Sequence, residues 1–235
     1  MDRFPSDRRP VADISGLNRF LTKMYGLMTF AVLISALTAW LVANVFANQF
    51  TAFLTNNRWG IWLIILLPIF LTFGISFNAT RSPGVSFVLL IITAVIYGIT
   101  FAFITGSYTG ADIATAFVSS AGIFLTMALI GTFSHRDFSR LGSYATAALV
   151  GLIIAMLVNL FLHSPAVNYV LSVIAVIIFT ILTAWDAQRM KSIYTGYGDE
   201  LSVNGLAVLG ALQLYLDFIN LFVSLLDIFG SGDER

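Results

Sequence analysis

Long apolar runs fill most of this chain of 235 residues and limit what it can fold into. A helix needs about 20 consecutive, mostly apolar residues to cross the hydrocarbon of a bilayer. Seven candidate spans meet that need: Met24–Phe46, Ile61–Phe77, Val85–Thr105, Ala111–Phe133, Ser143–Leu162, Asn168–Trp185 and Leu206–Phe229. The sequence therefore predicts an all-α integral membrane protein with seven transmembrane helices.

The composition fits such a protein and argues against several others. Hydrophobic residues make up 58% of the chain and charged residues 10%, whereas about 25% of the residues in a soluble domain are charged. A net charge of zero gives no indication of a nucleic-acid partner. With no cysteine, the chain has no disulfide, thiolate metal site or cysteine nucleophile. We expect no cofactor, and one membrane domain at 24–229 between a cytoplasmic tail at 1–23 and a short tail at 230–235.

The basic residues predict the orientation in the membrane. With a cytoplasmic N-terminus, two basic residues lie outside, Arg58 and Arg235, and ten lie inside: Arg3, Arg8, Arg9, Arg19, Lys23, Arg81, Arg136, Arg140, Arg189 and Lys191. This is a strong positive-inside signal, so we expect the N-terminus in the cytoplasm. Seven full spans place the C-terminus outside, whereas a re-entrant last segment would place it inside. The charge count does not separate these two cases.

Two carboxylates lie where hydrocarbon should exclude them. Asp217 lies within the last apolar run, in Leu-Tyr-Leu-Asp-Phe-Ile-Asn-Leu-Phe, and Asp186 directly follows the run that ends at Trp185. A charged side chain at the centre of a bilayer costs roughly 2.5–3.5 kcal/mol on insertion scales. Such a residue persists only if it is paired, hydrated or neutral, so this pair is the default functional site.

The last span carries further polar residues at helical spacing. They recur every three or four positions and so share one face of a helix. We call this face the polar seam; it consists of Gln213, Asp217, Asn220, Ser224 and Asp227. A face with two carboxylates cannot contact lipid, which indicates that other helices surround the last span. Gln, Asn and Ser alone would fit a packing seam, and Asp227 is near enough to the outer end to be hydrated.

A second helical pattern consists of small residues. In lipid, helices associate through close backbone contact and polar pairing rather than through apolar attraction. The fifth predicted span has small residues four positions apart, at Ser143, Ala147, Gly151 and Ala155. This stripe predicts close packing against another helix.

At the two aspartates the chain resembles the bacterial branch of the Bax inhibitor-1 family, also called the transmembrane Bax inhibitor motif family. The segments that carry the resemblance are Trp-Asp-Ala-Gln-Arg-Met-Lys around Asp186 and Tyr-Leu-Asp-Phe-Ile-Asn-Leu-Phe around Asp217. The span count, the span lengths and the polar start extend it over most of the chain. The resemblance implies a bacterial cytoplasmic-membrane protein with seven helices, the last one surrounded by the other six.

The resemblance also implies a function, a pH-sensitive calcium leak. In that family the aspartates corresponding to Asp186 and Asp217 are hydrogen-bonded to each other and act as the proton sensor. An arginine near the cytoplasmic end of the second helix helps to latch the closed state, and Arg81 is the basic residue at that place. One departure concerns the outer half of an ion path: some bacterial members carry an acidic residue in the second helix, and Ile61–Phe77 has none.

The chemistry of such a pair fits a proton sensor. Two neighbouring carboxyl groups in low dielectric cannot both ionise cheaply, so one keeps a proton and the pair titrates as a unit. The shared proton makes a short hydrogen bond between two helices. Its loss leaves two charges that repel each other and attract a cation. With Asn220 and water, Asp186 and Asp217 could form a weak calcium site, and weak binding suits conduction. Straight helices would leave the two residues about 10 Å apart in depth, so the pairing rests on the resemblance.

Two other functions compete with a leak. One is a membrane regulator that conducts nothing and binds another membrane protein, such as a quality-control protease. The other, an intramembrane protease, is disfavoured. A serine nucleophile needs a base within reach, and His135 and His163 both lie outside the predicted spans. Intramembrane aspartyl proteases carry Tyr-Asp and Gly-x-Gly-Asp motifs, where this chain has Trp-Asp186 and Leu-Asp217. We therefore expect no enzyme.

Overall fold

The apolar runs form helices in the computed structural model, which describes residues 14–57, 67, 70–72, 74–75, 82–197 and 202–230. The helices are α1 (Ile14–Asn44), α2 (Ala47–Asn56), α4 (Pro83–Thr105), α5 (Gly110–Phe133), α6 (Ser139–Leu162), α7 (Pro165–Tyr197) and α8 (Val203–Gly230). These described elements include no strand. All of the helices except α2 are long and apolar enough to cross a membrane. The protein is therefore an all-helical integral membrane protein.

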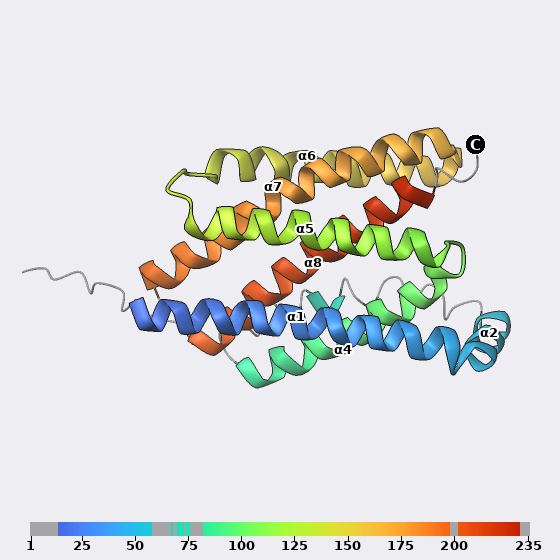
Figure 1. Ribbon diagram of the computed structural model, residues 1–235, viewed down its shortest axis with the longest axis horizontal. Helices are drawn as coiled ribbons and strands as arrows, with labels where there is room; N and C mark the ends of the chain where they lie inside the picture. Colours follow the sequence, from blue (N-terminus) through green and yellow to red (C-terminus); the bar gives the residue numbers. More distant parts are fainter. Residues whose placement is uncertain are drawn as a thin grey trace, which may run out of the picture.

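Six of the predicted spans correspond to these long helices. The boundaries differ at polar ends: α1 begins at Ile14 rather than Met24, and α7 continues past Trp185 to Tyr197. Most of the predicted span Ile61–Phe77 lies outside the described residues, so the count of seven stays a prediction. In Figure 1, α1 and α4 run in the same direction, which is the arrangement that a span between them requires. The short helix α2, at one end of the bundle, is not predicted by the sequence.

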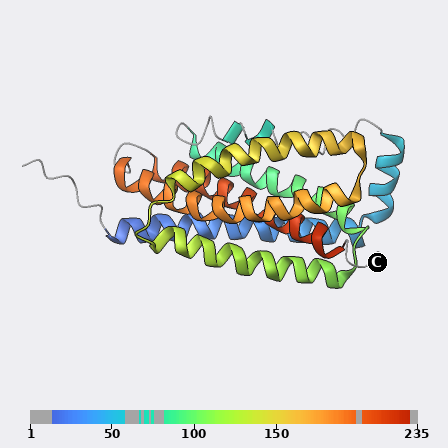
Figure 2. The same ribbon diagram turned by 90° about the horizontal axis from the view of Figure 1, so that it is seen from above.

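Helix α8 lies in the middle of the bundle. It runs obliquely behind α1 and α5 (Figure 1), and the view from above places it between the pair α6 and α7 and the pair α1 and α5 (Figure 2). It packs against α1, α4, α5 and α7. The most apolar window of α8 is 72% buried inside the protein, compared with 11–39% for the other candidate spans. Among the six long described helices α6 is the one that does not pack on α8 in this way, because it packs on α7 instead.

Local sequence signals set the turns between neighbouring helices. Thr109 caps α5 in a capping box: its hydroxyl accepts from the backbone N–H of Asp112, whose carboxylate accepts from the N–H of Thr109. Helix α6 ends at His163, which adopts the left-handed conformation with φ 51° and donates its N–H to the carbonyl of Asn159. Pro165 then begins α7. With these short connections α6 runs antiparallel to both α5 and α7, and α5 and α6 each pack on α7.

Two glycines let α5 and α6 close onto α7. A Cβ at Gly131 of α5 would overlap the backbone of Ala184, and a Cβ at Gly142 of α6 would overlap the ring of Trp185. Both contacts surround the part of α7 that carries Asp186. Small residues thus bring the backbones together in the way that membrane helices commonly use.

Most of the small-residue stripe on α6 makes no such contact with the described residues; Ala155 packs against the core, but the other three positions do not. Ser143, Ala147 and Gly151 are exposed, and a Cβ at Gly151 would meet nothing within 4 Å. The neighbouring positions Gly142 and Ala145 face inward instead. Spacing alone identifies a face of small residues but does not say what that face contacts.

The face of α8 toward α1, α4 and α5 is aromatic and hydrogen-bonded. Tyr215 is fully buried, and its hydroxyl lies 2.7 Å from the hydroxyl of Ser35, which donates to the carbonyl of Ala94 at 2.8 Å. Three helices are joined by this chain of hydrogen bonds. Phe218 meets the rings of Phe117 and Phe124 edge-on, with centroids 5.8 Å apart in each case.

Candidate functional site

Asp186 of α7 and Asp217 of α8 face each other inside the protein. They are 8% and 4% exposed, and their carboxyl groups lie within hydrogen-bonding range of each other. Oδ2 of Asp217 is buried and accepts no hydrogen bond from an N–H or O–H group of the described residues. A carboxyl group donates only when it carries a proton. A hydrogen bond between these two groups therefore requires a proton on one of them.

The lengths of α7 and α8 bring the two aspartates to similar depths. Asp186 is 11 residues from the end of α7 at Tyr197, about 17 Å along the helix, and Asp217 is 14 residues from the start of α8 at Val203, about 21 Å. These two ends lie on the same side of the bundle (Figure 1). The expected separation in depth rested on spans that begin at Asn168 and Leu206, whereas α7 continues to Tyr197 and α8 begins at Val203. The tilt of α8 accommodates the difference that remains.

The aspartates border a cavity of about 490 Å³ between α6, α7 and α8, which we call the acidic cavity. One wall is the apolar side of α6, with Leu149, Leu152, Ile153 and Met156. The opposite wall includes the whole polar seam: Gln213, Asp217, Asn220, Ser224 and Asp227. The seam therefore faces a cavity inside the protein.

The residues of the seam differ in how they are held. Asn220 donates to the carbonyl of Leu216 in its own helix at 2.8 Å, which leaves its side-chain oxygen as an acceptor. Oε1 of Gln213 is buried and accepts no hydrogen bond within the described part of the chain. Together with Asp217, this gives the acidic cavity two buried oxygens that no described donor satisfies. Buried polar atoms of that kind are rare and point to a functional site.

Asp227 is held in place by two distant residues that the sequence analysis did not find. Tyr108, in the turn before α5, donates to it at 2.7 Å, and Ser172 of α7 donates at 3.1 Å. Burial, together with the hydrogen bond and the negative charge of Asp227, raises the pKa of Tyr108, so the phenol stays protonated and remains a donor. No local sequence signal links residues so far apart.

Arg189 and Trp185 also border the acidic cavity, and the sequence analysis assigned a role to neither. The guanidinium of Arg189 lies 5.0 Å from the centroid of the Trp185 ring, a cation–π contact. The spacing of Asp186 and Arg189, three residues apart on one helix, could have indicated an interacting pair. Arg81, the expected latch, lies outside the described residues.

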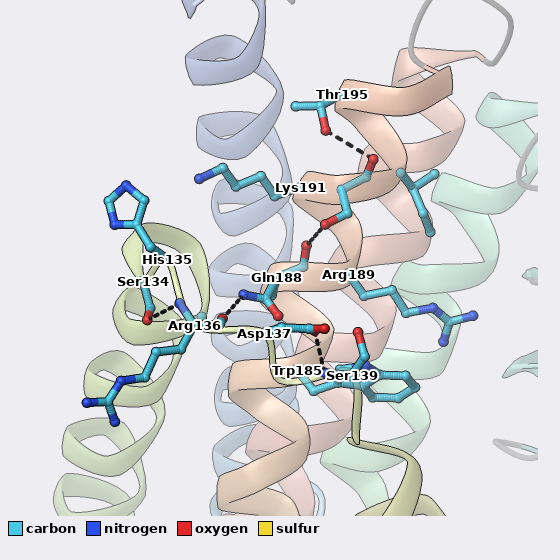
Figure 3. A pocket seen from close by; sticks show the side chains of 13 residues that line it. Ser134, His135, Arg136, Asp137, Ser139, Trp185, Gln188, Arg189, Lys191 and Thr195 are labelled. Atoms are coloured by element: carbon cyan, nitrogen blue, oxygen red, sulfur yellow. Dashed lines mark hydrogen bonds between the residues drawn. The ribbon is translucent and has the colours of Figure 1, made fainter. Parts of the chain in front are cut away.

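A second cavity, of about 520 Å³, lies beside the first and is shown in Figure 3. We call it the basic cavity, because Arg136, Arg189 and Lys191 line it. Gln188 joins its two sides by donating to the carbonyl of Arg136 at 2.6 Å and accepting from the N–H of Phe138 at 2.8 Å. The loop between α5 and α6 is thereby fixed against α7.

The described basic residues gather at one end of the bundle. Arg136, Arg140, Arg189 and Lys191 lie around the α5–α6 loop and the end of α7, and the start of α1 carries the others, Arg19 and Lys23, beside them. Lys23 donates to Asn204 at the start of α8 at 2.6 Å, and Lys191 donates to the carbonyl of Thr132 at 2.7 Å. This one-sided distribution is the pattern on which the predicted orientation rests.

The described residues contain no group of three or more His, Asp or Glu side chains that could hold a metal ion. A cation in the acidic cavity would instead meet the two aspartates and the amide and hydroxyl oxygens of the seam. Ca²⁺ takes six to eight oxygen ligands. Water would have to complete its coordination shell, which makes any such site a weak one.

Comparison with known proteins places the chain among bacterial membrane proteins. A family model described as inhibitor of apoptosis-promoting Bax1 matches residues 17–234. The inner membrane protein YbhL of Escherichia coli K12 is 38% identical over 233 residues, which cover 98% of this chain and 99% of YbhL. An uncharacterized membrane protein of Streptococcus pyogenes serotype M3 is 38% identical over 218 residues, 93% of this chain and 95% of the relative. An uncharacterized protein of Borreliella burgdorferi is 36% identical over 216 residues, 91% and 92% of the two chains.

Proposed function

The chain belongs to the Bax inhibitor-1 family, and on that premise we propose that it is a pH-sensitive calcium leak channel of the cytoplasmic membrane, gated by Asp186 and Asp217. The observation that carries the proposal is the meeting of these two buried carboxyl groups at the edge of the acidic cavity. Two helices contribute one carboxyl each, so a change in their proton state acts directly on how α7 and α8 pack.

The gate works through charge. While the pair shares one proton, a hydrogen bond ties α7 to α8 and the path stays closed. When the proton leaves, two negative charges repel each other in a medium of low dielectric, where such repulsion is strong. The helices separate, and the exposed carboxylates attract a cation from the acidic cavity. Flux should therefore rise with pH.

The acidic cavity supplies the passage beside the gate. Its polar wall offers oxygens from Gln213, Asn220 and Ser224 to a cation that has lost part of its water. With only two carboxylates at hand, binding is weak, and a weakly held ion can leave again. Arg81 acts as a latch in this proposal, pairing with the aspartates in the closed state. The N-terminus is cytoplasmic, in line with the basic residues at one end of the bundle.

The test is calcium flux into liposomes that contain only this protein, measured between pH 6 and pH 8. We expect flux that rises with pH in the wild type. Asp186→Asn or Asp217→Asn keeps the size of the side chain and removes the titrating charge, so the ratio of flux at pH 8 to flux at pH 6 should fall to about one. The double substitution should add little, because the two residues act as a unit.

Two further variants complete the design. Asp112→Asn makes the same chemical change at the exposed start of α5, away from the acidic cavity, and should leave the pH response intact. Arg81→Ala should raise flux at pH 6, where the wild type is nearly closed. Wild-type liposomes that pass no calcium at any pH would support a regulator that binds another membrane protein. A full pH response in both single aspartate variants would show that Asp186 and Asp217 are not the proton sensor.

A further inference from the structure

The acidic and basic cavities meet at two side chains. Trp185 and Arg189 line both cavities, and no other described residue does. Both belong to α7, one turn apart, and Asp186 lies between them in sequence. A direct path from one cavity to the other therefore runs beside these two side chains.

Trp185 is the fixed half of this partition. Its ring packs against Gly142 of α6 so closely that a Cβ there would overlap it. The ring is half-buried and lies against α6 at this glycine. Glycine at position 142 is therefore what allows a large aromatic ring to stand between the two cavities.

Arg189 is the charged half of the partition. Its guanidinium stacks over the Trp185 ring at 5.0 Å, and the residue is otherwise exposed. In Figure 3 the side chains of Arg189 and Lys191 leave α7 on opposite sides, and Lys191 is held by the carbonyl of Thr132. Of the cations that line the basic cavity, Arg189 alone also borders the acidic cavity within the described residues.

We propose that Arg189, held over the Trp185 ring, is an electrostatic barrier to cations at the basic end of the acidic cavity. A fixed guanidinium at a narrow passage repels cations and admits neutral molecules, as arginines do in other selective pores. The role of this barrier in gating rests on the proposed function, whereas its existence can be tested without measuring calcium flux. It restricts the passage on the side that the basic residues predict to be cytoplasmic.

The test uses cysteine accessibility, because the chain has no native cysteine. Asn220→Cys places a thiol on the wall of the acidic cavity and leaves both aspartates in place. Two methanethiosulfonate reagents of similar size, one with a trimethylammonium group and one with a sulfonate group, are added from each side of membrane vesicles. Ser192→Cys, which lines only the basic cavity, reports the side on which the reagents enter.

We expect Arg189→Gln to raise the rate of cationic modification of Asn220→Cys by about tenfold, the lower end of what local fields do to the concentration of ions. The rate with the anionic reagent should fall or stay the same, and both changes should appear only from the side that labels Ser192→Cys. Arg189→Lys keeps the charge but not the planar stacking, and should retain most of the discrimination. The matched control is Arg136→Gln, which removes a charge from the basic cavity alone.

The outcomes separate the barrier from the channel. If the cationic reagent modifies Asn220→Cys at the same rate with Arg189→Gln as with Arg189, or if Arg136→Gln has an equal effect, Arg189 is not the barrier. Neither result would contradict the proposed calcium leak. A rise with both reagents alike would mean that Arg189 blocks only by its size, which also overturns an electrostatic role. If accessibility changes as expected while liposomes pass no calcium, the barrier stands and the proposed channel fails.

Discussion

One face of α8 packs against α1, α4 and α5, and the other borders the acidic cavity. On the packed face, the hydroxyl groups of Tyr215 and Ser35 form a hydrogen bond, and aromatic rings of α5 and α8 meet edge-on. On the cavity face, Asp217 and Gln213 keep buried oxygens that no described donor satisfies. The same helix thus holds the bundle together on one side and leaves groups available for a ligand or a proton on the other.

The difference shows how a membrane protein can place charge in its interior. The hydrogen bonds and ring contacts on one face of α8 stabilise the folded protein, and they offset the cost of unpaired polar groups on the other face. Buried polar groups are costly when unpaired, so the cavity face persists because the other face secures the helix. Removing a hydrogen-bonding group from the packed face should therefore lower the free energy of unfolding, whereas removing a buried charge from the cavity face should not.

The largest effect on stability is expected on the packed face. Tyr215→Phe removes the hydroxyl that bonds Ser35 and should lower the free energy of unfolding in detergent by about 1–2 kcal/mol. Denaturant titration followed by circular dichroism measures the change. Tyr144→Phe, at an exposed tyrosine of α6, is the control and should change nothing measurable. A neutral Tyr215→Phe would show that the packed face does not depend on this network.

A smaller effect is expected where the cavity face is anchored. Tyr108→Phe removes a hydrogen-bond donor to Asp227 and should lower the free energy of unfolding by about 0.5–1 kcal/mol, since Ser172 still donates. The raised pKa of Tyr108 means that its contribution is fully present below the ordinary tyrosine pKa of about 10 and is lost as the pH rises further. Unfolding at pH 7 and pH 9 should therefore give the same difference between variant and wild type. A difference that shrinks between these two pH values would contradict that assignment.

The smallest effect on stability is expected at the functional pair. Asp217→Asn or Asp186→Asn should leave the free energy of unfolding within about 0.5 kcal/mol of the wild type, or raise it, because burying a charge is costly and the neutral amide still forms hydrogen bonds. The same denaturant titration applies. A loss as large as that of Tyr215→Phe would mean that the pair is a structural clamp, and the contrast between the two faces would disappear.

Sequence periodicity predicts the helices and the seam but not the neighbours of each side chain. The last span, its polar face and its central place follow from the spacing of Gln213, Asp217 and Asn220, because residues three and four apart share one side of any helix. The stripe on α6 has the same spacing, but three of its four residues, Ser143, Ala147 and Gly151, are exposed. Periodicity is a local property, whereas contact depends on where another helix crosses.

The sequence by itself determined that this chain lies in a membrane, that most of its basic residues lie on one side of that membrane, and that two carboxylates are placed where lipid cannot accept them. The family resemblance implied that Asp186 and Asp217 pair, although helix geometry alone did not. Only the tertiary structure decided that Asp227 binds Tyr108 and Ser172, and that Trp185 and Arg189 line two cavities. The physical reason is that hydrophobicity and helical period are set residue by residue. Depth and contact, by contrast, depend on the tilt of α8, the full length of α7 and the close approach of α6 at Gly142.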